Sequence, residues 1–331
     1  MSLARGQPKP LPGRPGALSV IVPVYNGAGT LGACLEALAQ QTVSPDDYEV
    51  IVVDDGSSDD SARIAARHGA TVLRQRQAGA AAARNRGARH ARGEILLFTD
   101  ADCRPEPDWI EEMVTPLADP QVAGVKGTYL TGQRSAVARF AQAEYEEKYR
   151  RMAGMERIDF VDTYAAAYRR DVFMAHGGFD SSFPTASVED QELSFRLAEA
   201  GHKLVFAPRA RVYHRHPDSL GRYARRKLHL GRWKVRVHTR HPAKALRDSY
   251  TPWSQKAQLL LLPLAAVAAL AAAARRLPWR AAAILAGLGL ASTAPLVREA
   301  RHQGKEVALA APFLALVRAA TLDLGLLWGL L

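Results

Sequence analysis

The amino-acid sequence predicts an α/β protein with a mostly parallel β-sheet, helices on both faces of that sheet, and apolar helices towards the C-terminal end. Within residues 17–99, short apolar runs typical of buried strands alternate with segments of helical spacing, which favours a parallel sheet. Acidic clusters follow two of these runs, at 54–59 and 100–102, and ligands bind such sheets at the carboxyl ends of the strands. Residues 257–331 contain three long apolar runs, typical of helices in a membrane or a buried core.

The predicted elements follow the chain in order. We expect strands at 17–24, 48–53, 70–74 and 94–99, and helices at 31–41, 61–68 and 79–92. Beyond Pro105 the pattern is mixed, with helices expected at 107–117, 136–151, 188–200 and 221–238 and strands at 162–168 and 204–207. Pro23 lacks a backbone donor, so we expect the pairing of the first strand to stop there. Ser57 or Ser58 fits the N-cap of the helix at 61–68.

The chain of 331 residues has a net charge of +11, which is concentrated in one segment. Residues 209–256 contain 14 Lys and Arg against 2 Asp and Glu, and residues 257–331 contain 7 against 3, which leaves a net charge of −5 for the first 208 residues. Because the basic segment directly precedes the apolar runs, it favours contact with anionic lipid over nucleic acid. The two cysteines, Cys34 and Cys103, exclude a disulfide-stapled scaffold.

The apolar runs lie at 257–274, 281–297 and 307–331. The first has 18 residues, which span about 27 Å as a helix, close to the roughly 30 Å of a bilayer core. We expect the first two runs to cross the membrane, with a shallow hairpin as the alternative. Arg318 and Asp323 are five residues apart in the third run, so this run is expected to pack against the protein.

Four regions follow from these patterns. Residues 1–16 are rich in Pro, Gly and Arg, without the apolar core of a signal peptide, and are expected to form a flexible tail. Residues 17–208 form the α/β domain, residues 209–256 a basic helical collar at the membrane surface, and residues 257–331 the membrane helices.

Several side chains at the strand ends are candidates for a site. Asp100 and Asp102 flank Ala101, and two carboxylates at this spacing suit Mg²⁺ or Mn²⁺ bound with phosphates, or else belong to an ordinary polar loop. Asp55 ends a strand next to Gly56, where it would accept a hydrogen bond from a base or ribose, or stabilise a solvated turn.

Other aromatic and charged residues likewise have both a functional and a structural interpretation. Tyr25 would stack on a base or cover the core, and Arg84 would reach a phosphate or lie on a solvated helix face. Glu189 and Asp190 open a helix, where acids are stabilised by the helix dipole or Asp190 serves as a general base. A further group shares one face of a basic helix and suits either a sugar or diphosphate, or the lipid headgroups: His229, Arg232 and Trp233.

Five of these segments occur together in one order: SVIVPVYN (19–26), VVDDGSSD (52–59), AGAAAARNRGA (78–88), FTDADC (98–103) and VEDQELSFRL (188–197). Together they resemble the family 2 glycosyltransferases, inverting enzymes of the GT-A fold that use nucleotide sugars. AAAYRRDVFMAHGGFD (165–180) is similar to the acceptor-side segment of that family. The resemblance covers residues 18 to about 240, two thirds of the chain.

The resemblance implies a role for each matching residue. Asp190 matches the catalytic base, and Asp102, with Asp100, matches the metal and diphosphate motif. Glu189, beside the base, would face acceptor or diphosphate. The matching positions for the nucleotide sugar are Pro23, Tyr25, Asn26, Asp55, Gly56, Arg84, Asp100 and Ala101. HLGRW (229–233) resembles the Gln-x-x-Arg-Trp motif of processive synthases, with His229 in place of Gln, so Arg232 and Trp233 are implied as acceptor or diphosphate contacts.

The implied function is that of a membrane-attached, inverting glycosyltransferase that depends on Mg²⁺ or Mn²⁺. It would move one sugar from a nucleoside-diphosphate donor, UDP- or GDP-linked, to a lipid or lipid-linked acceptor of the cell envelope. The alternatives are a polyprenyl-phosphate sugar synthase, a chain-extending synthase and a non-catalytic nucleotide-sugar-binding module. The implied location is the cytoplasmic membrane, with the catalytic domain facing the cytoplasm.

Overall fold

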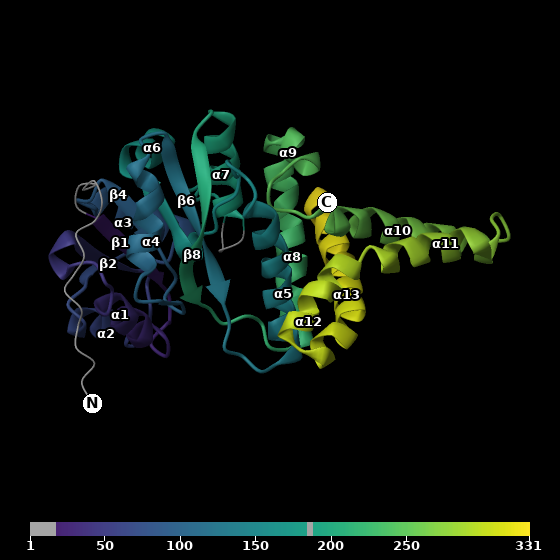
Figure 1. Cartoon of the computed structure of the whole chain (residues 1–331), viewed down its shortest axis with the longest axis horizontal. Helices are drawn as coiled ribbons and strands as arrows, with labels where there is room; N and C mark the ends of the chain where they lie inside the picture. The colour runs from purple at the N-terminus through teal and green to yellow at the C-terminus, as the bar shows by residue number, and fades with distance from the viewer. Residues whose placement is uncertain (1–17, 184–187) are drawn as a thin grey trace. The chain divides into compact units, whose positions relative to one another are not determined.

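The computed structural model describes residues 18–183 and 188–331, so the predicted tail at 1–16 lies outside the described residues. Contacts group the chain into two compact units. The N-terminal unit contains the described residues up to Leu130 together with Met155–His214, and the C-terminal unit contains Thr131–Gly154 together with Arg215–Leu331. Figure 1 labels the helices and strands of both.

The N-terminal unit is built on an eight-stranded sheet of order β3-β2-β1-β4-β7-β6-β8-β5. The first four strands in this order are parallel, β7 is antiparallel to β4 and β6, β8 is parallel to β6, and β5 is antiparallel to β8. The predicted α/β class is confirmed, with a sheet that is mixed in its second half. The strands are β1 (Leu18–Val24), β2 (Tyr48–Asp54), β3 (Thr71–Arg74), β4 (Ile95–Phe98), β5 (Arg104–Pro105), β6 (Val122–Leu130), β7 (Ala166–Arg169) and β8 (Lys203–Tyr213).

Helices cover this sheet and explain why its central strands are apolar throughout. The helices of the unit are α1 (Leu31–Ala39), α2 (Ser61–Arg67), α3 (Ala80–His90), α4 (Trp109–Val114), α6 (Arg170–Ala175) and α7 (Glu189–Glu199). Every residue of β1 and β4 is buried, as expected for strands covered on both faces. Helix α3 lies close to β1 because Gly87 has no side chain: a Cβ there would lie 2.5 Å from Cγ2 of Ile21.

The structure differs from the sequence prediction at several boundaries. Strand β6 was not expected, since Gly124, Lys126 and Gly127 interrupt its apolar pattern. Both glycines are needed because their neighbours leave no room for a Cβ. Strand β8 continues to Tyr213 because its second half pairs with β6 beyond a register shift, and β7 begins only at Ala166.

Two local predictions at the strand ends were wrong. The pairing of β1 with β2 continues past Pro23 to Val24. Only the pairing of β1 with β4 ends before the proline, at Ile21. The N-cap of α2 is Asp60 rather than Ser57 or Ser58.

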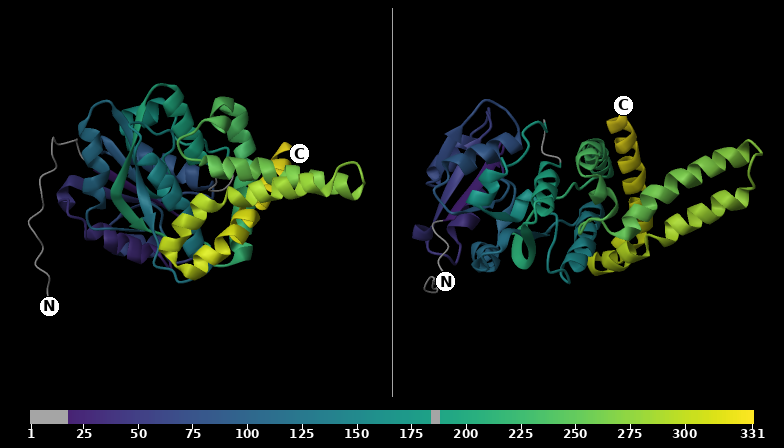
Figure 2. Two further views of the ribbon diagram at one scale, coloured as in Figure 1. Left: turned by 45° about the vertical axis from the view of Figure 1, so that its right-hand side comes forward. Right: turned by 90° about the horizontal axis from the view of Figure 1, so that it is seen from above.

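The C-terminal unit consists of helices around a second apolar core. The helices are α5 (Ala136–Met152), α8 (Leu220–Arg240), α9 (Pro242–Leu246), α10 (Trp253–Ala273), α11 (Trp279–Ala291), α12 (Ala294–Gln303) and α13 (Lys305–Leu330). Phe140, Tyr223, Leu296 and Val307 form part of its core. Helices α10 and α11 lie side by side as a hairpin (Figure 2).

Three helical segments of this unit are long and apolar enough to cross a membrane: Trp253–Ala273, Trp279–Gln303 and Lys305–Leu330. The second is divided into α11 and α12. They correspond to the three apolar runs of the sequence.

Candidate active site

The first component of the site is a pair of loops at the ends of β1 and β2. Asn26 has a positive φ of 49°, and its Oδ1 accepts a hydrogen bond of 2.8 Å from the Ser58 amide. The backbone N–H of Asn26 donates to Oγ of Ser57 at 2.9 Å. Tyr25, one residue earlier, is 49% exposed. The loops are therefore tied together by Asn26, while the Tyr25 ring is available for stacking.

Asp55 organises the loop that leads into α3. Its Oδ1 accepts from the Ala78 amide at 2.8 Å and from Nε2 of Gln75 at 2.7 Å, and its Oδ2 accepts from the Gly79 amide at 2.8 Å. The neighbouring Gly56 has a φ of 83°, a left-handed conformation that suits glycine. Both carboxylate oxygens of Asp55 thus already bind the chain.

Arg84 connects the end of β4 to the start of α7. Its Nη2 donates to Oδ1 of Asp100 at 2.7 Å, and its Nη1 donates to Oε1 of Glu189 at 2.9 Å. The side chain is buried. Burial by itself lowers the pKa of Arg84, but the carboxylates of Asp100 and Glu189 outweigh it and raise the pKa above its usual value. Arg84 is therefore a buried cation held by two of the predicted acids.

Asp190 follows Glu189 in the first turn of α7. Its Oδ1 accepts a hydrogen bond of 2.7 Å from the Gln191 amide, and its backbone carbonyl accepts from Oγ of Ser194. Burial, followed by the nearby charges of Glu189 and Asp162, raises the pKa of the Asp190 carboxyl well above its usual range. A carboxylate with a raised pKa is a stronger base than an ordinary aspartate, which suits general base catalysis.

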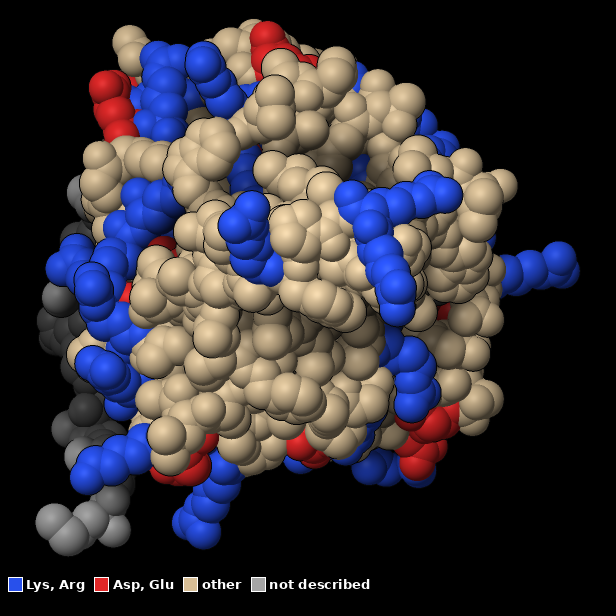
Figure 3. Space-filling model, turned by 90° about the vertical axis from the view of Figure 1, so that its right-hand side faces the viewer, with Lys and Arg blue, Asp and Glu red and all other residues tan. Residues whose placement is uncertain are grey.

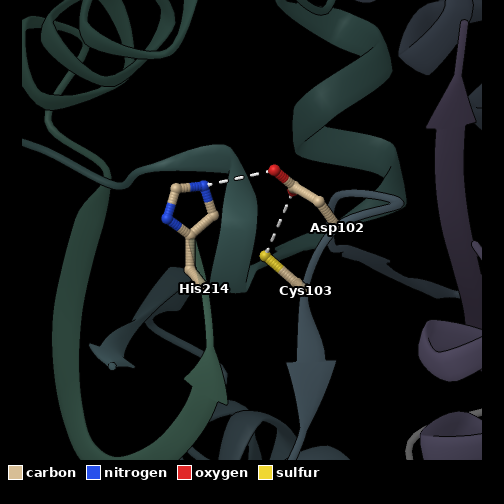
Figure 4. Close-up of side chains that lie close together, drawn as sticks. All are labelled: Asp102, Cys103 and His214. Carbon is tan, nitrogen blue, oxygen red and sulfur yellow. Dashed lines mark hydrogen bonds and ion pairs between the residues drawn. The ribbon is translucent and has the colours of Figure 1, made fainter. Parts of the chain in front are cut away.

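Asp102 and His214 form the second contact of the site. Their Oδ2 and Nε2 atoms lie 3.6 Å apart, with Sγ of Cys103 close by (Figure 4). The strand pair β5–β8 explains this proximity. Arg104 of β5 pairs with Tyr213 of β8, so Cys103 and His214 adjoin the pair, and Asp102, one residue earlier, lies beside His214.

His214 was not among the residues expected from the sequence. The only local signal is a histidine directly after a run of strand-forming residues. The pairing of two segments more than 100 residues apart is what makes it significant, and spacing alone does not reveal such a pairing.

The donor atoms at this position fit a divalent cation. A carboxylate oxygen and an imidazole nitrogen are both suitable ligands for Mn²⁺. The Cys103 thiol is a soft donor, which suits Mg²⁺ and Mn²⁺ less well than a carboxylate oxygen or an imidazole nitrogen does. Asp102 and His214 are therefore the candidate ligands, whereas Asp100 is engaged by Arg84.

The remaining predicted residues lie elsewhere in the structure. Pro23 is a buried residue of β1, and Ala101 is part of the turn after β4. The predicted acceptor residues of α8 belong to the C-terminal unit. There, the rings of His229 and Trp233 are 6.3 Å apart, and the Arg232 guanidinium lies 4.0 Å from the ring centre of Trp328.

Comparison with known proteins identifies the family. The model of "Glycosyl transferase family 2" matches residues 19–177. Glycosyltransferase AglE of Haloferax volcanii is 31% identical over 66% of this chain and 73% of its own length. The chain belongs to glycosyltransferase family 2. The pre-mycofactocin glycosyltransferase of Mycobacterium tuberculosis is 30% identical over 69% of this chain, which spans about half, 48%, of that relative.

A solved structure extends the similarity to nearly the whole chain. The mannosyltransferase PcManGT of Pyrobaculum calidifontis, determined with GDP-mannose and Mn²⁺, matches with a TM-score of 0.61 and 25% identity. The match covers 95% of this chain and 86% of that protein. The family 2 chain is therefore a glycosyltransferase with a GT-A fold, and its apolar helices fit a membrane region.

Proposed function

We propose that this family 2 glycosyltransferase is attached to the cytoplasmic membrane, with its catalytic unit facing the cytoplasm. It transfers one sugar, with inversion, from a nucleoside-diphosphate sugar to a hydroxyl of a lipid or lipid-linked acceptor. The observation that carries this proposal is the convergence of Arg84, Asp100 and Glu189 beside the general base candidate, Asp190. A carboxylate of raised pKa next to a fixed cation suits proton abstraction close to an anionic leaving group.

The donor would bind across the strand ends of the N-terminal unit. The exposed Tyr25 ring stacks on the base, and Asn26 and Gly56 shape the loops around it. Asp55, although bound to the loop before α3, retains lone pairs for the base. Asp102 and His214 would hold Mg²⁺ or Mn²⁺, which supplies positive charge opposite the leaving diphosphate. Support for a metal-bound nucleoside-diphosphate sugar comes from PcManGT, which was determined with GDP-mannose and Mn²⁺.

The chemical step is a single displacement. As the acceptor oxygen forms its bond to the anomeric carbon, the bond from that carbon to the diphosphate oxygen breaks on the opposite face, which inverts the configuration. The hydroxyl proton passes to the Asp190 carboxylate. Arg84 holds Glu189, the residue that precedes the base in the chain. The charged Arg84 guanidinium also lies beside Asp100.

The C-terminal unit supports a membrane-bound acceptor and a single transfer. Its basic segment and apolar helices suit an anionic lipid surface. Three apolar segments are too few to build a polysaccharide channel, and His229 replaces the Gln of the processive motif. Arg232 and Trp233 would contact acceptor or diphosphate.

Transfer is tested with the full chain in detergent, a panel of nucleotide sugars, and Mn²⁺ or Mg²⁺, with and without extracted membrane lipid. We expect one donor to release nucleoside diphosphate faster with lipid, and Asp190→Asn to abolish that release. Binding without release from any donor, under all lipid conditions, would instead identify a binding module. Addition of many sugars to each acceptor would identify a chain-extending synthase.

A further inference from the structure

The long apolar helix α13 has two apolar faces with different surroundings. On one face, Val307, Ala311, Leu314 and Ala315 are buried in the core formed with α5 and α12. The opposite stripe is exposed over the length of the helix: Leu309, Phe313, Leu324 and Leu327, each at least 57% exposed. These four positions lie within about 60° of one another around a helix of 3.6 residues per turn.

The helix that α13 packs against along its second half is strongly charged. Helix α8 contains eight Lys and Arg residues. The two backbones approach closely because a Cβ at Gly231 would collide with the Leu322 carbonyl oxygen, and one at Gly325 would collide with that of Leu228. A helix in such close contact with α8 cannot lie in the bilayer core unless α8 accompanies it, and the charges of α8 oppose that.

A buried ion pair fixes the level of α13 relative to the other helices. Arg318 of α13 donates to Oε1 of Glu144 in α5 at 2.9 Å, and Lys227 of α8 reaches the other oxygen of Glu144, also at 2.9 Å. Arg318 also donates to Gln258, near the start of α10, at 2.7 Å. All three charged side chains are at least 85% buried. Charged side chains such as these are costly to place in a bilayer core.

Helix α12 is also held against α5. Leu296 and Ala300 are buried in the core with α5, and Glu299 forms an ion pair with Arg150 of α5. Hydropathy joins α11 and α12 into one candidate span, but α12 packs into the helical core with α5 and α13.

The α10–α11 hairpin has the opposite character. Its apolar side chains point outward and are at least 53% exposed: Leu260, Val267, Leu270, Ile284 and Leu288. The hairpin projects from the other helices of the unit (Figure 2), and the view of Figure 3 shows a wide uncharged surface with scattered Lys and Arg and few acidic side chains. Lipid tails are the partner that such a two-sided apolar hairpin fits.

The polar residues of the hairpin lie at its two ends. At the base, Nε2 of Gln258 donates to the Ser292 carbonyl at 3.2 Å. At the tip, Arg275, Arg276 and Arg280 accompany Trp279, which is 62% exposed. Residues 259–274 rise about 24 Å between these ends, and the 13 residues of α11 rise about 20 Å. Arginine side chains that extend towards the headgroups, together with local thinning of the bilayer, bridge the difference from the roughly 30 Å core, and Trp is typical of that interface.

We propose that the chain crosses the membrane only twice, through α10 and α11, while α12 and α13 stay with α5 and α8 on the side from which α10 enters. The exposed stripe of α13 rests on the lipid surface. The C-terminal residue Leu331 therefore lies on the same face of the membrane as the chain before Trp253. This inference rests on the membrane attachment proposed above and adds its topology.

The test uses the full chain in sealed membrane vesicles of known orientation, with an epitope after Leu331 and a membrane-impermeant maleimide. Two matched variants carry one added thiol each: Arg247→Cys before α10 and Arg276→Cys at the hairpin tip, both at exposed positions. The native Cys34 and Cys103 are buried, so background labelling is low.

We expect the Arg247→Cys thiol and the C-terminal epitope to be accessible from one face, and the Arg276→Cys thiol only from the other. An epitope on the Arg276→Cys face would show a third crossing through α13 and overturn the inference. Labelling of both thiols from one face would show a hairpin that does not cross, which also overturns it. Release of the protein from membranes by alkaline carbonate would instead contradict the proposed attachment itself.

Discussion

The Arg84 guanidinium lies 2.9 Å from the Glu189 carboxylate, although the two residues are 105 positions apart in the chain. The same guanidinium holds Asp100 at 2.7 Å. Helix α3 can position Arg84 there because Gly87, one turn later, allows the helix to approach β1. One buried side chain therefore links the acidic ends of β4 and α7. The candidate base and the candidate diphosphate-binding loop thus both lie close to the charge of Arg84.

Removal of this cation should destabilise the N-terminal unit. In Arg84→Met, Glu189 and Asp100 lose their shared partner, and breaking a buried ion pair in this way costs about 3–5 kcal/mol. Since the side chain of Asp100 is 27% exposed, we expect the lower part of that range. Thermal unfolding in detergent measures the change. Arg89→Met, an exposed arginine of the same helix, is the control and should change little.

Loss of the general base should greatly reduce transfer without loss of donor binding. We expect Asp190→Asn to reduce kcat by about 10²–10⁴-fold, the range typical of general base catalysis. Nucleotide-sugar affinity, measured by calorimetry, should remain within a few-fold. Glu199→Gln at the other end of α7 is the control, and near-normal transfer by Asp190→Asn would refute the assignment.

The pH dependence of transfer should report the raised pKa of Asp190. The base must be deprotonated, so kcat falls as the pH drops through this pKa, at a higher pH than for an ordinary aspartate of pKa about 3.9. Because the charge of Asp162 contributes to the shift, Asp162→Asn should move the acidic limb of the kcat profile to lower pH. If the acidic limb does not move in Asp162→Asn, that limb does not report the pKa of Asp190.

Metal affinity should depend on Asp102 and His214 and not on Cys103. We expect Asp102→Ala to lose metal-dependent donor binding and His214→Ala to weaken Mn²⁺ binding at least about tenfold, as loss of a metal contact does. Cys103→Ser should bind Mn²⁺ normally because a thiol is a soft ligand, whereas carboxylate oxygen and imidazole nitrogen suit Mn²⁺. Mn²⁺ titration followed by electron paramagnetic resonance compares the three variants, and equal weakening in Cys103→Ser would make the cysteine a ligand.

The buried Glu144 should dominate the acid stability of the C-terminal unit. Burial alone would raise its pKa, but Lys227, Arg318 and Lys148 lower it from 4.5 to about 2. A lowered carboxyl pKa stabilises the native state above about pH 4.5, and this contribution disappears as the pH falls through about 2.

A matched pair of variants tests this. In Glu144→Gln the buried Arg318 and Lys227 lose their counter-charge, which should cost about 3–5 kcal/mol at neutral pH and flatten the acid dependence. Glu146→Gln, two residues along the same helix, should retain both stability and acid dependence. Unfolding temperatures in detergent from pH 3 to pH 7 compare them. If Glu144→Gln unfolds at the same temperatures as the unmodified chain over this pH range, the ion pairs of Glu144 with Arg318 and Lys227 do not contribute to stability.

Much of the fold could be predicted because its signals are local. The strands at 18–24, 48–54 and 95–98 are mostly apolar runs, and acidic clusters follow two of them. Strand β6 could not be predicted in this way, since Gly124, Lys126 and Gly127 interrupt its pattern. The two glycines are explained only by neighbours such as Tyr168, Leu204 and Ala210, which leave no space for a Cβ, and Lys126 by its buried ion pair with Asp162.

The site shows the same division. Asp100, Asp102, Glu189 and Asp190 were expected from their positions at element ends. The position of Arg84 between Asp100 and Glu189, rather than on a solvated face, depends on how closely α3 packs against the sheet.

The sequence by itself determined the α/β class, the family, the acids at the strand ends and the apolar character of the C-terminal helices, because periodicity and motif order are properties of neighbouring residues. Only the tertiary structure decided that His214 meets Asp102 and that Arg318 of an apolar helix is neutralised by Glu144. Both contacts join segments more than 100 residues apart. Their energies come from strand pairing and from burial of charge, which no local pattern encodes.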